Sequence, residues 1–399
     1  MSDVHNPPYA LNIDYTSTDS GFALSQFADQ NYDFAVSEIP YGAGSTPATS
    51  PPSFPFIYLP ITAAGIALMY NIPGLNTTLQ LSSSTACAIL TGGITNWDDP
   101  SIASQNPGAT LPDLAIQPVT ESDSTGANYV LEQWCIEEQP SLWATFANQE
   151  LTQPGGPTDG VSISATTPNP NWPAILPNGL DEASTTAVAG LIEADPGAIG
   201  AVQSQCAVDD GFGTGNPAAG VASVENASGD FTQPTSVDVA SGLAYATELN
   251  GTAQLDFDGI GPLVYPLAML SYLLTPTTGW DSAKGGTMSQ FIDYALTLGQ
   301  ENSVNFGYVG LGLTVEKHGV DAVQSDVPGA VPLTSTEQAA YACGDLTQTD
   351  VQAGQTSPTC GPPGETPEVP FALALPLAAA VIITLTYLEY EKRRRRFKM

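Results

Sequence analysis

The chain has 399 residues, 42% of them hydrophobic, and is long enough to form about two lobes with real cores. Its formal net charge is −33, and six of its eight basic residues lie in the last eight positions. The remaining surface is strongly acidic and repels phosphate backbones, which argues against nucleic-acid binding.

Strand-like and helix-like segments alternate along residues 1–324. Near the start, two segments with strand composition, 9–15 and 32–39, flank a segment with helical spacing of apolar residues at 21–30. The apolar, β-branched and aromatic run 54–72 predicts buried sheet. Further helices are expected at 84–93, 125–138, 184–195 and 288–303, and a further strand at 198–203. This alternation predicts an α/β architecture with largely parallel sheets.

The C-terminal part has the composition of a membrane anchor. Residues 325–368 are rich in Pro, Gly, Ser and Thr and predict a stalk. Residues 369–388 carry no charge and are long enough to span a bilayer core of about 30 Å. The basic tail 389–399 then indicates a cytoplasmic C-terminus, with residues 1–368 extracellular. The first residues lack the features of a signal peptide, so we expect either a true start further upstream or a truncated copy.

The five cysteines fit an oxidising exterior. Cys343 and Cys360 flank a polar segment, and a bridge between them is plausible. Cys87, Cys135 and Cys206 leave one cysteine over, and their pairing stays open. No CxxC pattern occurs, which argues against a zinc or redox site.

Catalytic chemistry has little support in the residues. The only histidines are His5 and His318, and no GxSxG occurs, so a Ser-His-Asp triad is not expected. The run DFDG at 256–259 begins like a calcium loop, but its twelfth residue would be Leu267 instead of Glu, so we expect a plain turn. A carboxylate pair for glycoside hydrolysis stays open, although no pair stands out. We therefore expect no enzyme, no cofactor and no metal.

Two loops, 17–27 and 122–134, place Ser, Thr and Gly at the start of an amphipathic helix. Free N–H groups and the positive end of the helix dipole meet there, an arrangement that favours an anion. Ordinary N-capping would produce the same pattern.

The run from 87 to 134, with GGITNWDDPSIASQNPG followed by a strand and a Ser/Thr-Gly turn, resembles the phosphate-binding receptors of ABC phosphate importers (PstS-like). Other similar blocks follow in the same order at 14–40, 59–74, 179–203, 265–274 and 289–312. The resemblance implies a two-lobed clamshell of the type II periplasmic-binding-protein class over residues 1–324. Lobe one would comprise about 1–62 and 267–324, and lobe two about 63–266.

The resemblance also implies five ligand-binding residues. Ser20 matches the family's serine after its second strand. Glu38 closes the pattern that the family writes Asp-Phe-Gly-Ala-Ser-Asp, whose last residue accepts the proton of hydrogen phosphate. Asp123, Thr125 and Gly126 match the Asp, Ser and Gly of the family's Arg-Ser-Asp-Gly-Ser-Gly-Thr loop.

Three departures weaken the match. The family's arginine is Glu121 here, its last threonine is Ala127, and its first anion loop, Gly-Ala-Gly-Ala-Thr-Phe-Pro, should precede residue 11 and is not there. Each charge-assisted hydrogen bond of the lost guanidinium contributes up to about 3 kcal/mol, and a carboxylate in its place repels a dianion. If Glu121 points to solvent, the anion can still bind to backbone amides.

These residues predict a membrane-anchored extracytoplasmic solute-binding protein. The resemblance makes phosphate the expected ligand, with ABC permease and ATPase subunits as partners. An alternative stays open, namely a cell-surface interaction or sensing protein on the same scaffold that has lost anion binding and takes a cation or no small ligand.

Overall fold

The computed structural model describes the following residues: 5–6, 9–11, 13–42, 50–152, 163–172, 179–209, 211–212, 216–249, 251–303, 306–335 and 337–338. The predicted membrane segment 369–388, the basic tail 389–399, Cys343 and Cys360 lie outside them. Within the described part of the chain, no helix has the length and apolar character needed to cross a bilayer. Contacts divide the chain into two units, unit 1 (1–18, 277–306 and 311–399) and unit 2 (19–276 and 307–310).

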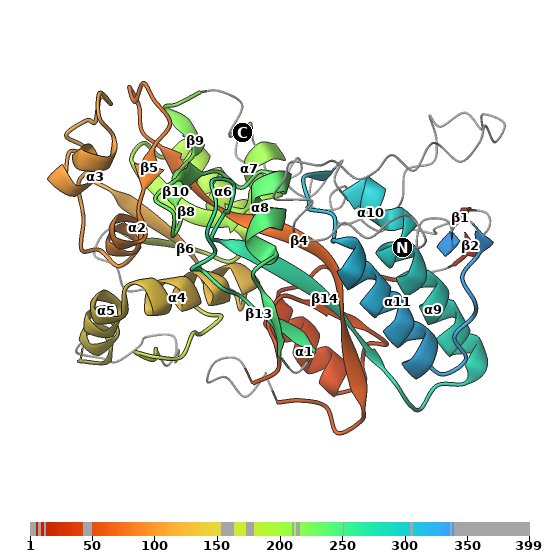
Figure 1. Ribbon diagram of the computed structural model, residues 1–399. Coiled ribbons are helices and arrows are strands. Elements are labelled where there is room, and N and C mark those ends of the chain that lie inside the picture. The colour runs from red at the N-terminus through yellow and green to blue at the C-terminus, as the bar shows by residue number, and fades with distance from the viewer. Residues whose placement is uncertain are drawn as a thin grey trace, which may run out of the picture. The chain divides into compact units, whose positions relative to one another are not determined.

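Unit 2 contains a seven-stranded sheet with the strand order β3-β14-β4-β8-β6-β7, with β9 paired to β4 (Figure 1). Its strands are β3 (Ala35–Ser37), β4 (Phe56–Asn71), β6 (Gln117–Glu121), β7 (Leu180–Glu182), β8 (Ala198–Gln203), β9 (Ala219–Val221) and β14 (Ala268–Pro276). The strand β4 confirms the sheet predicted at 54–72, and its residues from Ala63 to Tyr70 are all buried. Such a continuous buried run is expected where both faces of a strand are covered.

The sheet is mixed, so the prediction of largely parallel sheets is wrong. The strand β4 pairs antiparallel with β14, β8 and β9, and β14 pairs antiparallel with β3. The parallel pairs described in this sheet are β6 with β8 and β6 with β7. The alternation of helices and strands gives no information about the direction of β14, because β14 pairs with β4 although many helices and strands separate the two along the chain.

The helices expected at 21–30, 84–93, 125–138 and 184–195 are present in unit 2, and four further helices among its described residues were not expected. Together these helices are α1 (Ser20–Ala28), α2 (Ser83–Leu90), α3 (Pro100–Gln105), α4 (Gly126–Glu138), α5 (Pro140–Thr152), α6 (Thr185–Ala194), α7 (Ser204–Asp209) and α8 (Ser236–Leu243). A disulfide joins Cys87 of α2 to Cys135 of α4, a pair that the sequence left open. Two small sheets complete the unit: β5 (Gln80–Leu81), β10 (Ser223–Glu225) and β11 (Phe231–Thr232) form one, and β12 (Thr247–Leu249) and β13 (Thr252–Gln254) the other.

Unit 1 contains the antiparallel pair β1 (His5–Asn6) and β2 (Tyr9–Ala10) and the helices α9 (Ser282–Leu296), α10 (Leu298–Ser303) and α11 (Leu313–Asp326). The helix predicted at 288–303 begins earlier, because Asp281 caps it by accepting hydrogen bonds from the backbone N–H groups of Ala283 and Lys284. The non-helical backbone of Thr297 then separates α9 from α10. The strand predicted at 9–15 is reduced to β2.

Candidate functional site

The start of α1 holds Ser20 in place. Asp19 caps this helix, since its side chain accepts a hydrogen bond of 2.8 Å from the backbone N–H of Phe22. Leu24 and Phe27 are completely buried in a core cluster that also contains Ala35 of β3. Ser20 itself is buried as the first residue of α1, so its hydroxyl has a fixed direction.

Glu38 follows β3 directly, and both of its carboxylate oxygens accept hydrogen bonds. Its Oε2 accepts from the Ser20 hydroxyl at 2.5 Å, and its Oε1 accepts from the Ser271 hydroxyl at 3.0 Å. Ser271 lies on β14, which pairs with β3 so that Tyr272 is opposite Ser37. The sequence reasoning missed Ser271, although a single serine in the apolar run 265–274 was a visible signal.

The start of α4 lies against Glu38. Thr125 caps α4, since its Oγ1 accepts from the Asn128 N–H at 3.3 Å, and its own N–H donates to the Pro170 carbonyl at 3.0 Å. Gly126 is buried so closely that an added methyl group would lie 2.1 Å from Cβ of Glu38. Only a glycine therefore fits at this position without a shift of its neighbours.

The loop before α4 also meets the start of α1. The N–H of Gly21 donates to the Ser124 carbonyl at 3.3 Å. The Ser124 hydroxyl is buried and has no hydrogen-bond partner among the described residues. Asn128 fixes the loop, because its side-chain amide donates to the carbonyls of Glu121 (2.7 Å) and Pro170 (3.2 Å). Sequence reasoning missed Asn128 as well, and its only signal was an amide side chain two residues after the Ser/Thr-Gly turn.

Glu121 ends β6 and is only 5% exposed, so the expectation that it could point to solvent is wrong. Its Oε2 accepts a hydrogen bond of 2.8 Å from the Thr185 hydroxyl of α6. Burial raises the pKa of Glu121 to about 7, repulsion by Asp123 and Glu38 adds to this, and the Thr185 hydrogen bond opposes it. Near neutral pH this carboxyl is therefore partly protonated.

The structure thus brings Ser20, Glu38 and Gly126 into contact and places Thr125 beside them. Asp123 is half-buried in the same loop, and its pKa is raised by burial and by the nearby charge of Asp19. No lysine or arginine occurs between residues 19 and 276. Among the described residues, no group of three or more His, Cys, Asp or Glu side chains lies close enough together to hold a metal ion. The arrangement offers hydroxyl and helix-start donors around one acceptor carboxylate, which suits a small anion that carries a proton.

Comparison with known proteins identifies the family. Residues 3–297 match the family model described as the PBP superfamily domain. The chain belongs to the PBP superfamily. This membership confirms the predicted α/β binding-protein fold and agrees with a non-enzymatic family.

Named relatives of this PBP-superfamily chain are distant. The phosphate-binding protein PstS2 of Mycobacterium bovis (strain BCG / Pasteur 1173P2) is 32% identical over 163 residues, which is 39% of this chain and 42% of that relative, so the chain spans less than half of it. The phosphate-binding protein PstS of Xylella fastidiosa (strain Temecula1 / ATCC 700964) is 23% identical over 313 residues, covering 77% of this chain and 76% of the relative. These matches confirm the predicted PstS-like resemblance as a distant one.

Two solved structures share the fold. A high affinity periplasmic phosphate-binding protein (PfluDING) bound with phosphate has a TM-score of 0.54 at 16% identity and covers 79% of this chain and 92% of its own. A human phosphate binding apolipoprotein has a TM-score of 0.53 at 15% identity and covers 84% of this chain and 91% of its own. At such identities the likeness concerns the fold alone.

Proposed function

We propose that the chain is an extracytoplasmic solute-binding protein that binds phosphate for ABC-type import, with permease and ATPase subunits as partners. In this proposal residues 369–388 anchor it in the membrane and residues 1–368 lie outside. The predicted lobes, about 1–62 with 267–324 and about 63–266, close around the ligand. Membership of the PBP superfamily and the similarity to relatives named as phosphate-binding proteins support this proposal.

The observation that carries the proposal is the meeting of two helix starts at one carboxylate. A helix start stabilises a nearby negative charge by about 0.3–1 kcal/mol, and by up to about 2 kcal/mol in a partly buried site. Ser20 and Thr125 add hydroxyl donors. Glu38 would exchange its bonds to Ser20 and Ser271 for the proton of hydrogen phosphate, which sulfate lacks at neutral pH. Five residues, Ser20, Glu38, Asp123, Thr125 and Gly126, would thus bind the ligand.

One observation favours the alternative, a surface interaction or sensing protein that has lost anion binding. The Glu38 carboxylate already accepts hydrogen bonds from the hydroxyl groups of Ser20 and Ser271. Glu121 and Asp123 add negative charge nearby. With no basic side chain in residues 19–276, such a site repels a dianion unless its carboxyl groups take up protons. The raised pKa of Glu121 reduces this repulsion near neutral pH.

Calorimetry on the full-length chain separates the two functions. Phosphate is titrated at pH 5 to 8 in low salt, with sulfate and calcium as controls. Submillimolar phosphate binding without sulfate binding supports the receptor. No binding heat with either anion, together with binding heat from calcium, supports the alternative.

Replacing Thr125 by valine is expected to weaken phosphate binding about tenfold, because one hydroxyl hydrogen bond contributes about 1–1.5 kcal/mol. The substitution also removes the cap of α4, which costs about 1 kcal/mol of stability. Thr235 is a matched control, since it caps α8 in the same way by accepting from the Asp238 N–H. Thr235→Val should lower the melting temperature similarly and leave phosphate affinity unchanged, and Thr125→Ser should restore binding. Equal affinity in Thr125→Val and the parent chain would remove Thr125 from the site.

A further inference from the structure

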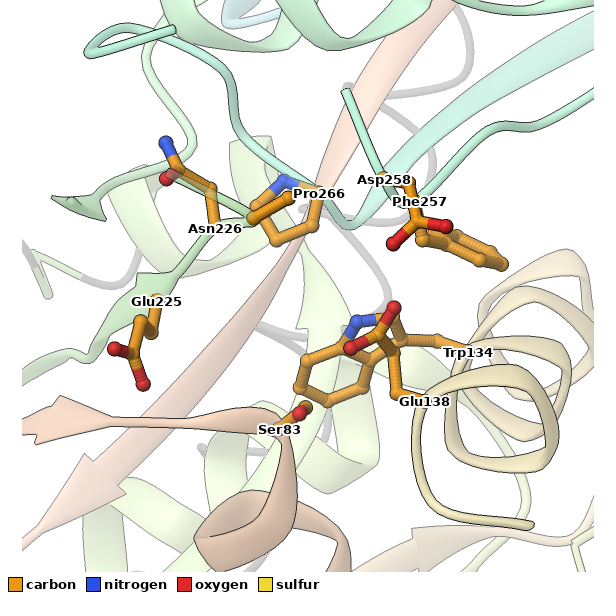
Figure 2. Close-up of a pocket in the computed structure, with 9 residues that line it drawn as sticks. Ser83, Trp134, Glu138, Glu225, Asn226, Phe257, Asp258 and Pro266 are labelled. Atoms are coloured by element: carbon orange, nitrogen blue, oxygen red, sulfur yellow. The ribbon is translucent and has the colours of Figure 1, made fainter. Parts of the chain in front are cut away.

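A pocket lies in unit 2, with a volume of about 290 Å³ (Figure 2). It is lined by Ser83, Trp134, Glu138, Glu225, Asn226, Ala227, Phe257, Asp258 and Pro266. Its volume is near the lower end of the range of about 300–1,000 Å³ that small-molecule sites occupy. The size therefore suits a ligand of a few heavy atoms.

Separate elements build this pocket. Trp134 and Glu138 belong to the last turns of α4, while Thr125 caps the opposite end of the same helix. Thirteen helical residues extend about 20 Å, so the pocket is separate from the candidate anion site. Ser83 begins α2, and Glu225 ends β10, which pairs in parallel with β5 just before α2. Asp258 comes from the DFDG run, for which the sequence predicted only a turn.

The charge of the pocket selects a cation. Glu138, Glu225 and Asp258 contribute three carboxyl groups, and the negative end of the α4 dipole adds to their field. No lysine or arginine lies in residues 19–276 to neutralise them. Burial raises the pKa of Glu138, the charge of Asp258 raises it further, and a hydrogen bond with Ser83 lowers it. A bound cation would relieve the repulsion between Glu138 and Asp258.

The indole of Trp134 gives an independent indication of a ligand. Trp134 is 1% exposed, yet its Nε1–H has no hydrogen-bond partner among the described residues. Figure 2 shows this nitrogen on the side of the ring that faces the pocket. This donor opens onto the pocket without a protein acceptor in the described part of the chain, so an oxygen atom of a ligand would satisfy it. Asn226 differs, because its amide already donates to the carbonyls of Gly261 and Val264.

We propose that this pocket binds a small organic cation, a primary ammonium that carries a hydroxyl or carbonyl oxygen on a neighbouring carbon. Its ammonium group would donate to Glu138 and Asp258, and its oxygen would accept from the indole N–H of Trp134. The three carboxylates are not grouped closely enough to form a metal site, whereas an ammonium group with an adjacent oxygen can reach separated partners. The rigid rings of Trp134 and Phe257 would exclude water from one side of the ligand.

Titration of the full-length chain with 2-aminoethanol at pH 7 in low salt tests this site. We expect saturable binding that Glu138→Gln and Asp258→Asn each weaken at least about tenfold. The matched control is Glu137→Gln, which removes the same charge from an exposed neighbour on α4 that does not line the pocket, and it should change affinity less than about twofold. Phosphate binding should be the same in all four proteins, so this result does not depend on the proposed function.

The Trp134 contact has its own readout. The parent chain should prefer 2-aminoethanol to propylamine, which has no acceptor oxygen, and Trp134→Phe should abolish this preference. If the Trp134 variant does not fold, the preference of the parent chain for 2-aminoethanol over propylamine alone tests the contact with Trp134. The proposal is overturned by the absence of 2-aminoethanol binding, by equal weakening in Glu137→Gln, by equal affinity for propylamine, or by calcium binding with the same dependence on Glu138 and Asp258.

Discussion

Replacing Gly126 by alanine is expected to lower phosphate affinity at least about a hundredfold and to lower the melting temperature. The added methyl group would lie 2.1 Å from Cβ of Glu38 and 3.0 Å from Sδ of Met269. Since Cβ of Glu38 is fixed to the backbone, either the start of α4 or the residues after β3 must move. Overpacking of this kind costs about 1–3 kcal/mol in stability, and the movement separates the two helix starts that would bind the anion.

Gly190 is the matched control for this substitution. It is also a helical glycine, in α6, but an added methyl group would meet no atom within 4 Å. Gly190→Ala should therefore leave phosphate affinity unchanged and raise stability by up to about 1 kcal/mol through helix propensity. Calorimetry gives the affinities, and thermal unfolding gives the stabilities. A Gly126→Ala protein with the parent's melting temperature and affinity would show that the close packing at Glu38 is not required.

Replacing Glu121 by glutamine is expected to stabilise the protein at pH 8 by on the order of 3 kcal/mol. Burial raises the pKa of Glu121 to about 7, from its ordinary value of about 4.5. Between these values the folded chain holds a proton that the unfolded chain has lost, so stability falls as pH rises from about 4.5 to 7. Glutamine resembles the protonated carboxyl and can still accept from Thr185, so this pH dependence should disappear.

Chemical unfolding between pH 4.5 and 8 measures this effect. Glu193 of α6 serves as the control, because Glu193→Gln removes the same charge from an exposed carboxyl instead of a buried one. Its stability should stay close to that of the parent at every pH. Phosphate binding at pH 8 should also strengthen in Glu121→Gln, since a negative charge beside the candidate site is removed. A Glu121→Gln protein no more stable than the parent at pH 8 would contradict the buried, proton-binding state.

The local elements of the fold were predictable from the sequence because their signals are local. The spacing of Leu24 and Phe27 predicted α1, and the apolar run at 54–72 predicted β4. Strand direction was not predictable in this way, because the antiparallel pairing of β14 with β4 depends on segments far apart in the chain. The boundary between α9 and α10 also escaped prediction, since it depends on the backbone conformation of one residue, Thr297.

The candidate site was only partly predictable for the same reason. Ser20 and Gly126 stand in loops whose pattern is visible, and the structure brings both to Glu38. Ser271 reaches Glu38 from 233 residues away, so no local pattern shows the contact. The burial of Glu121 depends on α6 covering the end of β6, and a sequence loop of Ser, Asp and Gly gives no sign of such a cover.

The covalent link between Cys87 and Cys135 ties the maturation of this chain to the supply of an oxidant. The bridge joins the helix that carries Trp134 and Glu138 to the helix that begins at Ser83. Because thiols stay reduced in most cytosols, the disulfide between α2 and α4 would form only after export or in an oxidising compartment. In a chain made in a reducing host this bridge would be absent. Packing alone would then hold together the two helices that line the pocket, α2 and α4.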